Sequence, residues 1–166
     1  VKVGELAWRS RERDLDHAEP ETEALPAWWF HAQRLRFDFR FKTLLESLGK
    51  VPELVEKDAL LLALRGFAEV GARRDGLGTL TRALDMPDAN QNTRQVVLHG
   101  LWLSNEEPYA EFSLKACDLI DELGETDYNT GFRRAAALRK LGRYDEALTA
   151  IDDAIEMLGT TSTDIH

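Results

Sequence analysis

The histidines of this chain, the side chains that most often bind metals or move protons, stand apart from one another. There are four of them, at His17, His31, His99 and His166. None has a second histidine, a cysteine or a carboxylate at a spacing that places both on one helical face, whereas zinc needs three or four converging ligands. Paired acids such as Asp152-Asp153 point about 100° apart on a helix, and solvent exposure explains them. The sequence therefore predicts no metal site and no cofactor.

Two further features that could do chemistry have structural explanations. Cys117 lies on the apolar side of a predicted helix in a strongly acidic segment, whereas a reactive thiolate needs a base and an electropositive setting. We interpret it as a buried structural cysteine. The glycine-rich stretch 71–78 is superficially similar to a phosphate loop, but it lacks the Lys and Ser/Thr that should follow Gly76, and it follows a helix instead of a strand. We interpret this stretch as a turn.

The overall charge excludes two classes of partner. The chain of 166 residues carries a formal net charge of −9. Nucleic acids and acidic membrane surfaces bind clustered Lys and Arg, so we expect neither as a partner. No apolar run approaches the roughly 20 residues that cross a bilayer, and no signal peptide is visible. A single cysteine allows no internal disulfide and fits a reducing compartment, so we expect a cytoplasmic protein.

The elements that position these side chains are helical hairpins, and the clearest one covers Tyr128 to Leu158. Residues 133–141 are strong helix formers, and Gly142 then ends the helix, because a residue without Cβ adopts the left-handed conformation easily. Beyond it, apolar residues recur at steps of three and four: Tyr144, Ala147, Leu148, Ile151, Ala154, Ile155 and Leu158. This spacing predicts an amphipathic second helix that packs antiparallel on the first.

This hairpin resembles the tetratricopeptide repeat family. The family signature pairs small residues in the first helix with a Gly-x-Tyr-x-x-Ala turn and a later Ala-Leu pair, and the matching residues here are Ala135, Gly142, Tyr144, Ala147, Ala154 and Ile155. The resemblance implies an all-α, right-handed solenoid of helical hairpins that offers a binding surface and performs no chemistry.

Earlier segments repeat the pattern less closely. Tyr109 precedes Tyr144 by 35 residues, and Gly100 then falls at the place of Ala135, where the two helices of such a hairpin approach closely. A third, degenerate copy contains Gly71 at the turn, with Arg73 at the tyrosine position. We therefore expect TPR-like hairpins at residues 57–160, divided into 57–90, 93–126 and 128–160, and a polar tail at 161–166.

Residues 1–56 do not follow this period, and we expect them to form a helical N-terminal cap. Val3 to Ala18 is typical of a charged helix. Residues 34–42 fit two structures: the alternation of apolar and charged residues is typical of a half-buried strand, whereas steps of three and four from Phe30 to Leu48 favour one long helix. We favour the helix. The dense aromatic residues of this segment are then either a capping core that closes the open end of the stack or a ligand pocket, and we favour the capping core.

A binding site is expected on the first helices of the hairpins, because in tetratricopeptide arrays these helices line a concave groove. For this chain the resemblance implies two sets of groove residues: Asn129, Arg133, Ala136 and Lys140 in the last hairpin, and Arg94, Leu98, Leu101 and Asn105 in the preceding one. Such a mixture suits an extended peptide or a partner helix. Alternatively, these basic side chains are merely solvated.

Three functions are compatible with the sequence. The first is a non-catalytic adaptor that binds a protein or peptide in the groove. The second is a regulatory or self-association domain of a larger bacterial transcription or signalling protein. Independently of the function, we expect either a homodimer or a further downstream segment to cover the C-terminal edge at Ile151, Ile155 and Leu158. The third is an enzyme with a site near Trp28, His31 and Arg34, which we disfavour because no nucleophile, base and orienting group converge in the sequence.

Overall fold

The computed structural model of the protein describes residues 18–163, and in this range the chain forms helices and no strand. The helices are α2 (Leu25–Phe37), α3 (Phe41–Leu48), α4 (Pro52–Lys57), α5 (Ala59–Gly71), α6 (Leu77–Asp85), α7 (Gln91–Trp102), α8 (Glu107–Glu122), α9 (Tyr128–Lys140) and α10 (Tyr144–Thr163). The predicted all-α class is confirmed for this range. The helix predicted from Val3 lies outside the described residues, except for Ala18.

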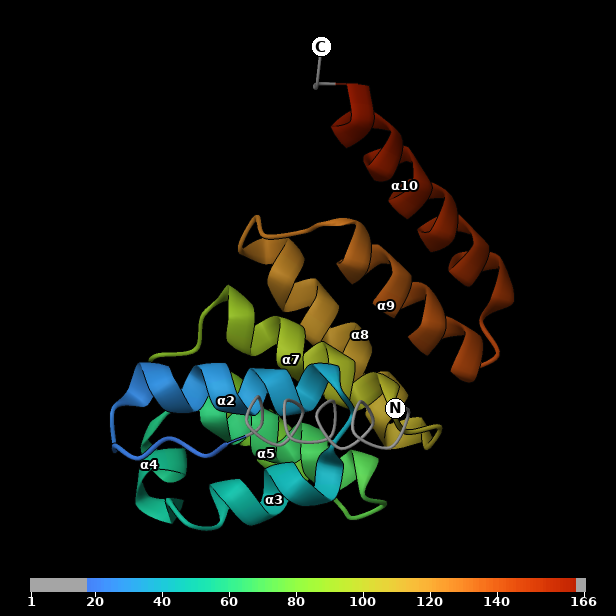
Figure 1. Ribbon diagram of the computed structural model, residues 1–166. Coiled ribbons are helices and arrows are strands. Elements are labelled where there is room, and N and C mark those ends of the chain that lie inside the picture. Colours follow the sequence, from blue (N-terminus) through green and yellow to red (C-terminus); the bar gives the residue numbers. More distant parts are fainter. Residues whose placement is uncertain (1–17, 164–166) are drawn as a thin grey trace, which may run out of the picture.

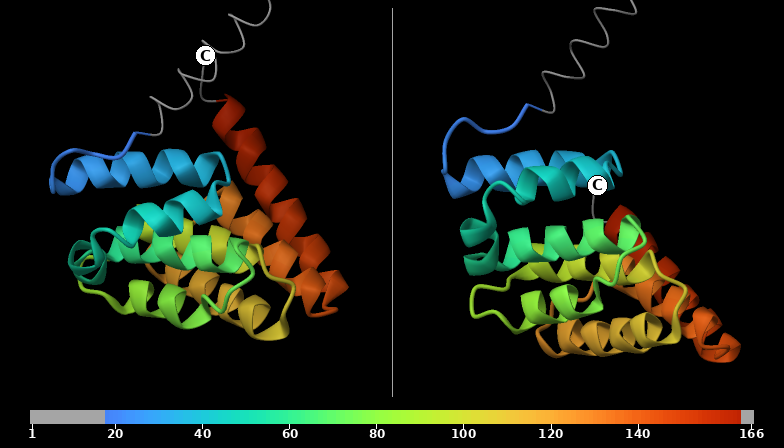
Figure 2. Two further views of the ribbon diagram at one scale, coloured as in Figure 1. Left: turned by 60° about the horizontal axis from the view of Figure 1, so that its bottom comes forward. Right: turned by 90° about the horizontal axis from the view of Figure 1, so that it is seen from below.

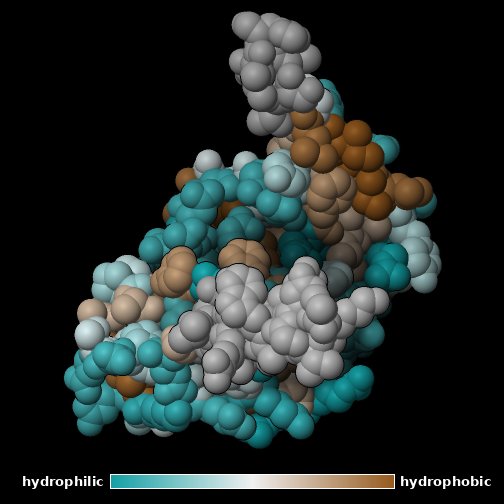
Figure 3. All heavy atoms as spheres, in the orientation of Figure 1, coloured by the Kyte–Doolittle hydropathy of each residue, from teal (hydrophilic) through white to brown (hydrophobic). Residues whose placement is uncertain are grey.

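The helices follow one another across the molecule in chain order. From α5 onward they succeed each other through α7, α8 and α9 to α10, which forms one edge (Figure 1). Helices α2 and α3 pack on one side of α5, and α6 and α7 pack on the other (Figure 2). On the face shown in Figure 3, the surface is hollowed next to the α9–α10 hairpin.

The segment 34–42 is neither a strand nor part of one continuous helix. Helix α2 ends at Phe37, α3 begins at Phe41, and Phe39 between them has a positive φ of 53°. The Arg40 amide donates to the Leu35 carbonyl, a hydrogen bond that closes a helix end. The Phe39 ring packs edge-on against His99 with its centroid 5.8 Å away. Contact with a distant helix therefore holds a bulky residue in a conformation that local preference disfavours. The predicted strand is wrong, and the predicted long helix is interrupted at residues 38–40.

Side-chain caps define where the first helix of each hairpin begins. The Asp58 carboxylate accepts a hydrogen bond from the Leu61 amide before α5, and Asn90 forms a reciprocal capping box with Thr93 before α7. Asp127 accepts from the Thr130 amide before α9. These three caps fall near the starts of the three predicted hairpins. Gly142, with φ of 74°, ends α9 as its sequence position predicted.

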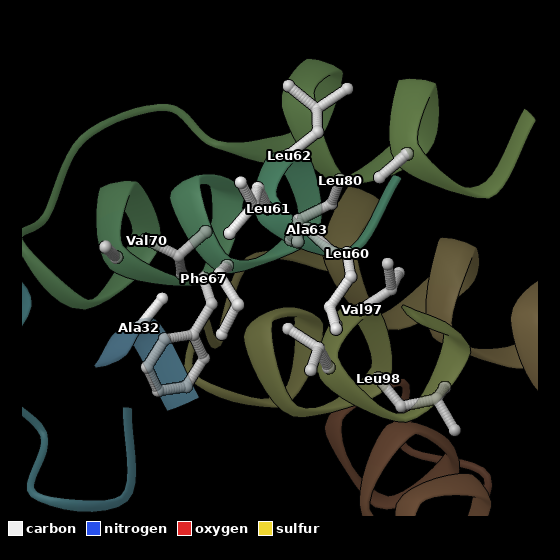
Figure 4. Packing of buried hydrophobic residues seen from close by; sticks show 14 of the residues in the cluster. Ala32, Leu60, Leu61, Leu62, Ala63, Phe67, Val70, Leu80, Val97 and Leu98 are labelled. Atoms are coloured by element: carbon white, nitrogen blue, oxygen red, sulfur yellow. The ribbon is translucent and has the colours of Figure 1, made fainter. Parts of the chain in front are cut away.

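The main core lies between α5 and its neighbours, as Figure 4 shows. Phe67 of α5 is completely buried, as are Leu80 of α6 and Leu98 of α7. A Cβ on Gly100 would lie 3.0 Å from Leu80 and 3.2 Å from the Phe67 Cα atom. Gly100 is thus required for close packing, as predicted, but the partner is the preceding hairpin and not the second helix of its own.

The junctions between successive hairpins differ. In the preceding hairpin, the main partner of α7 is the first helix, α5, whereas the main partner of α9 is the second helix, α8. Tyr109 is consequently 5% exposed, with its hydroxyl bonded to the Gly76 amide and to Asp75. The equivalent Tyr144 is 65% exposed. The periodicity of the sequence is therefore not matched by a constant stacking geometry.

The C-terminal hairpin has its own small core. Its buried residues are mostly alanines, with Leu138 as the largest. Helix α10 packs on α9 and continues to Thr163, so the predicted polar tail from residue 161 is helical in its first three residues. Because alanines bury little area, this hairpin has less apolar stabilisation than the α5–α7 core.

Candidate functional site

A cluster of basic and aromatic side chains lies where α2, α7 and α9 meet. Helix α2 contributes Arg36, α7 contributes His99 and Trp102, and α9 contributes Arg133 and Lys140. We call these five residues the basic–aromatic cluster. Arg36 and His99 are 63 residues apart in the sequence, so no local pattern could have predicted that they meet.

The hydrogen bond between Arg36 and His99 determines which ring nitrogen of the neutral histidine carries the proton. The Arg36 Nη1 atom lies 2.9 Å from His99 Nδ1, and a guanidinium can only donate. His99 Nδ1 must therefore accept, which leaves the proton of the neutral ring on Nε2. Burial, together with the positive charges of Arg133 and Arg36, lowers the pKa of His99 to about 4. The histidine is thus neutral at physiological pH and adds no charge to the cluster.

The two arginines of the cluster are held without carboxylates. The guanidinium of Arg133 lies over the Trp102 ring at 4.7 Å from the centroid, and that of Arg36 lies over Phe37 at 4.4 Å. Neither arginine takes part in an ion pair within residues 18–163. The pKa of Arg36 is lowered mainly by burial and also by the nearby positive charge of Arg133.

Lys140 connects α9 to the end of α7. Its Nζ atom donates to the carbonyl oxygens of Trp102 at 2.5 Å and of Ser104 at 2.6 Å. These carbonyls belong to the C-terminal end of a helix, where a cation is stabilised by the helix dipole. Lys140 therefore has a structural role, while it also adds positive charge beside Arg133.

An apolar groove runs beside this cluster, between α9 and α10. It has a volume of about 380 Å³, and its exposed apolar lining residues are Phe132, Tyr144 and Leu148. Figure 3 shows the apolar surface of this hairpin next to the hollow. Ile155 continues the apolar stripe of α10 and is 54% exposed. We call this feature the α9–α10 groove.

The predicted groove residues from α7 and its following turn lie elsewhere. Leu98 and Leu101 are buried in the main core, so they cannot line an open groove, and their prediction as binding residues is corrected. Arg94 is also buried, and its guanidinium makes two hydrogen bonds to Glu125, at 2.7 and 2.5 Å. Asn105 is exposed in the turn before α8, but it lies near Arg73 and Arg74, which follow α5. The reason is that α5, α6 and α8 pack around α7 and cover the face that carries the three buried residues.

The predicted residues of α9, in contrast, lie around the site. Arg133 and Lys140 belong to the basic–aromatic cluster, and Ala136 lines the α9–α10 groove. Asn129 is exposed near the start of the helix. Their spacing of four, three and four residues keeps them on one side of α9. The structure therefore brings the cluster and the groove together on this single helix.

The N-terminal part contains a contact between a serine, a histidine and a glutamate that no sequence pattern indicated. Ser47 Oγ lies 3.1 Å from His31 Nε2, and it donates to Glu19 Oε1 at 3.0 Å. A nucleophilic serine must instead donate to the histidine, because the histidine is the base that takes the proton. Here the serine proton faces the carboxylate of the exposed Glu19, so the geometry is that of a partly buried structural network.

Cys117 has the properties of a structural residue. Cys117 is completely buried, and burial raises the pKa of its thiol to about 12. Its predicted burial is confirmed.

In residues 18–163, histidine, cysteine and acidic side chains form no group of three or more that could hold a metal ion. No helix in this range is long and apolar enough to cross a membrane.

Comparisons of this chain with protein-family models, with curated proteins and with solved structures find no match.

Proposed function

We propose that the protein is a non-catalytic adaptor that binds an acidic amphipathic helix of a protein partner on its hollowed face. The observation that carries this proposal is that two partly buried arginines, Arg36 and Arg133, lie close together and form no ion pair within residues 18–163, and that Arg133 shares helix α9 with the open apolar groove. In a chain with a net charge of −9, such an uncompensated basic site is a specific feature.

The chemistry of the partner follows from the two parts of the site. Aliphatic and aromatic side chains on one stripe of a helix fit the α9–α10 groove, where Phe132 and Leu148 are exposed. Carboxylates on the flank of that helix fit the guanidinium groups of the cluster, since arginine binds carboxylates with paired hydrogen bonds. The stacking of Arg133 on Trp102 holds its guanidinium in place before binding, which reduces the entropy lost on association.

The same proposal includes the finer architecture. We propose that the three hairpins are divergent TPR-like units in which only the last hairpin keeps an open surface. Proteins of this kind act as scaffolds for other proteins, and the buried free thiol of Cys117 suits the reducing cytoplasm in which we place this adaptor.

Fluorescence anisotropy tests the function. The probe is a labelled synthetic helical peptide with four leucines at steps of three and four and with glutamates on one flank. Its matched control carries lysines in place of the glutamates. We expect the acidic peptide to bind and the basic peptide to bind at least about tenfold more weakly, with an affinity that falls as salt is added.

Matched variants locate the binding surface. Arg133→Glu should weaken binding of the acidic peptide about tenfold or more. Lys115→Glu, which makes the same charge change at an exposed position of α8, should leave the affinity unchanged. Equal affinity of the acidic and basic peptides, or an equal loss in both variants, contradicts the proposed function.

A further inference from the structure

The outer face of the C-terminal hairpin is divided into three parallel strips. The first strip is the basic side of α9, with Arg133 and Lys140. The middle strip is the apolar groove. The third strip is the far flank of α10, where Asp145 and Asp152 are exposed and take part in no ion pair within residues 18–163.

Helix α10 has the chemistry that the proposed site requires of its ligand. Its exposed apolar stripe contains Tyr144, Leu148 and Ile155. Asp145 and Asp152 follow this stripe by about 80° to 100° around the helix, which places them on one flank. An amphipathic helix with acids on one flank is what the groove and the basic–aromatic cluster accept.

The basic and acidic residues also lie at matching heights along the hairpin. Gly131 of α9 lies against Ala154 of α10, where an added Cβ would be 2.8 Å from the alanine Cβ. The two helices are antiparallel, so equal steps from these residues reach equal heights. Two residues after Gly131 and two residues before Ala154, Arg133 is level with Asp152. Nine residues from the same two starting points, Lys140 is level with Asp145.

We propose that two copies of this chain associate face to face through their α9–α10 hairpins, with α10 of each copy lying over α9 of the other. This proposal rests on the proposed function, because it names the helix that occupies the site. Each interface then contains the same contacts twice, as in any two-fold symmetric dimer. The exposed apolar stripes pack together in the centre, in the manner of a four-helix bundle.

Charge decides how the two copies are oriented. A two-fold axis perpendicular to the helices would place α10 over α10 and bring the acidic flanks together, which is unfavourable. A two-fold axis parallel to the helices places α10 over α9 and preserves height along the hairpin. Asp152 of each copy then faces Arg133 of the other, and Asp145 faces Lys140. The strips are therefore self-complementary for the parallel axis alone.

Sedimentation equilibrium of the full chain tests this association. We expect a reversible monomer–dimer equilibrium with a micromolar dissociation constant. Leu148→Glu introduces a charge into the apolar strip and should weaken dimerisation about a hundredfold or more. Thr149→Glu adds the same charge one residue further, outside the groove, and should leave the dimer intact.

A charge-reversal pair tests the orientation. Arg133→Glu and Asp152→Arg should each weaken the dimer about tenfold, and the double variant should recover wild-type association to within about threefold. Circular dichroism confirms that each variant is folded. Failure of the double variant to recover overturns the parallel two-fold axis.

The outcomes separate this proposal from the adaptor function. A wild-type chain that stays monomeric at concentrations far above micromolar overturns the self-association, as does a Leu148→Glu chain that still dimerises. If such a monomer binds the acidic peptide, the occupant is a helix of a different protein and the adaptor function stands. If it binds no peptide, both proposals fail.

Discussion

Removal of the hydroxyl from Tyr109 or from the equivalent Tyr144 tests whether the two tyrosines have different surroundings in successive hairpins. The Tyr109 hydroxyl accepts a hydrogen bond from the buried Gly76 amide at 3.1 Å and donates one to Asp75, also at 3.1 Å. Tyr109→Phe leaves that amide unpaired, which costs about 1–3 kcal/mol of unfolding free energy. Tyr144 occupies the equivalent sequence position but is 65% exposed. Tyr144→Phe should therefore change the stability by less than about 0.5 kcal/mol.

Urea unfolding followed by circular dichroism measures this difference. Both variants should keep the wild-type m value, since neither changes the area exposed on unfolding. The midpoint should fall for Tyr109→Phe and stay constant for Tyr144→Phe. In a thermal scan the Tyr109 variant should melt roughly 2–4 °C lower for each kcal/mol lost. Equal losses in the two variants would show that the tyrosines have equivalent surroundings and would refute the reasoning.

Three further predictions concern single positions. The pKa of His99 is lowered from 6.5 to about 4, so the unfolded chain takes up this proton first and stability falls as pH drops through that window. The loss should reach about 2 kcal/mol at pH 5 and be smaller in His99→Gln, as measured by urea unfolding at pH 7 and pH 5. Gly131→Ala should destabilise the protein by about 1 kcal/mol or more, because the added Cβ meets Ala154. Gly78 has open space around it, so Gly78→Ala should stabilise helix α6 by up to about 1 kcal/mol. Thermal melts of the two variants measure this difference. Cys117, whose thiol pKa is about 12, should react with iodoacetamide at pH 8 many times more slowly in the native protein than in urea, and equal rates would contradict its burial.

Local patterns in the sequence predicted most of the helices. The steps of three and four from Tyr144 to Leu158 and the turn at Gly142 correctly predicted the last hairpin. The same patterns placed Cys117 on a buried face. These predictions succeed because helix periodicity and helix termination depend on residues only a few positions apart. The break at Phe39 could not be predicted in this way, since its packing partner His99 comes from a distant helix.

The predicted binding residues divide along the same line. Their helical faces were predictable, but whether a face is covered depends on where the next hairpin packs. Leu98 and Leu101 are buried, and Arg94 is paired with Glu125. Arg133 and Lys140 instead contact the end of α7, and their neighbours Arg36 and His99 have no sequence signal that connects them to α9.

The sequence alone determined that this chain forms amphipathic helical hairpins, because each apolar stripe is set by residues on successive turns of one helix. It also determined that Ile151, Ile155 and Leu158 belong to one such stripe. The tertiary structure decided which stripes are covered and which charges are neutralised. Helix α9 packs on α8 in place of repeating the α7–α5 contact, and the α9–α10 groove stays open on the helix that carries Arg133, which forms no ion pair within residues 18–163. Burial and charge pairing depend on distances between remote segments, and those distances exist only in the folded chain.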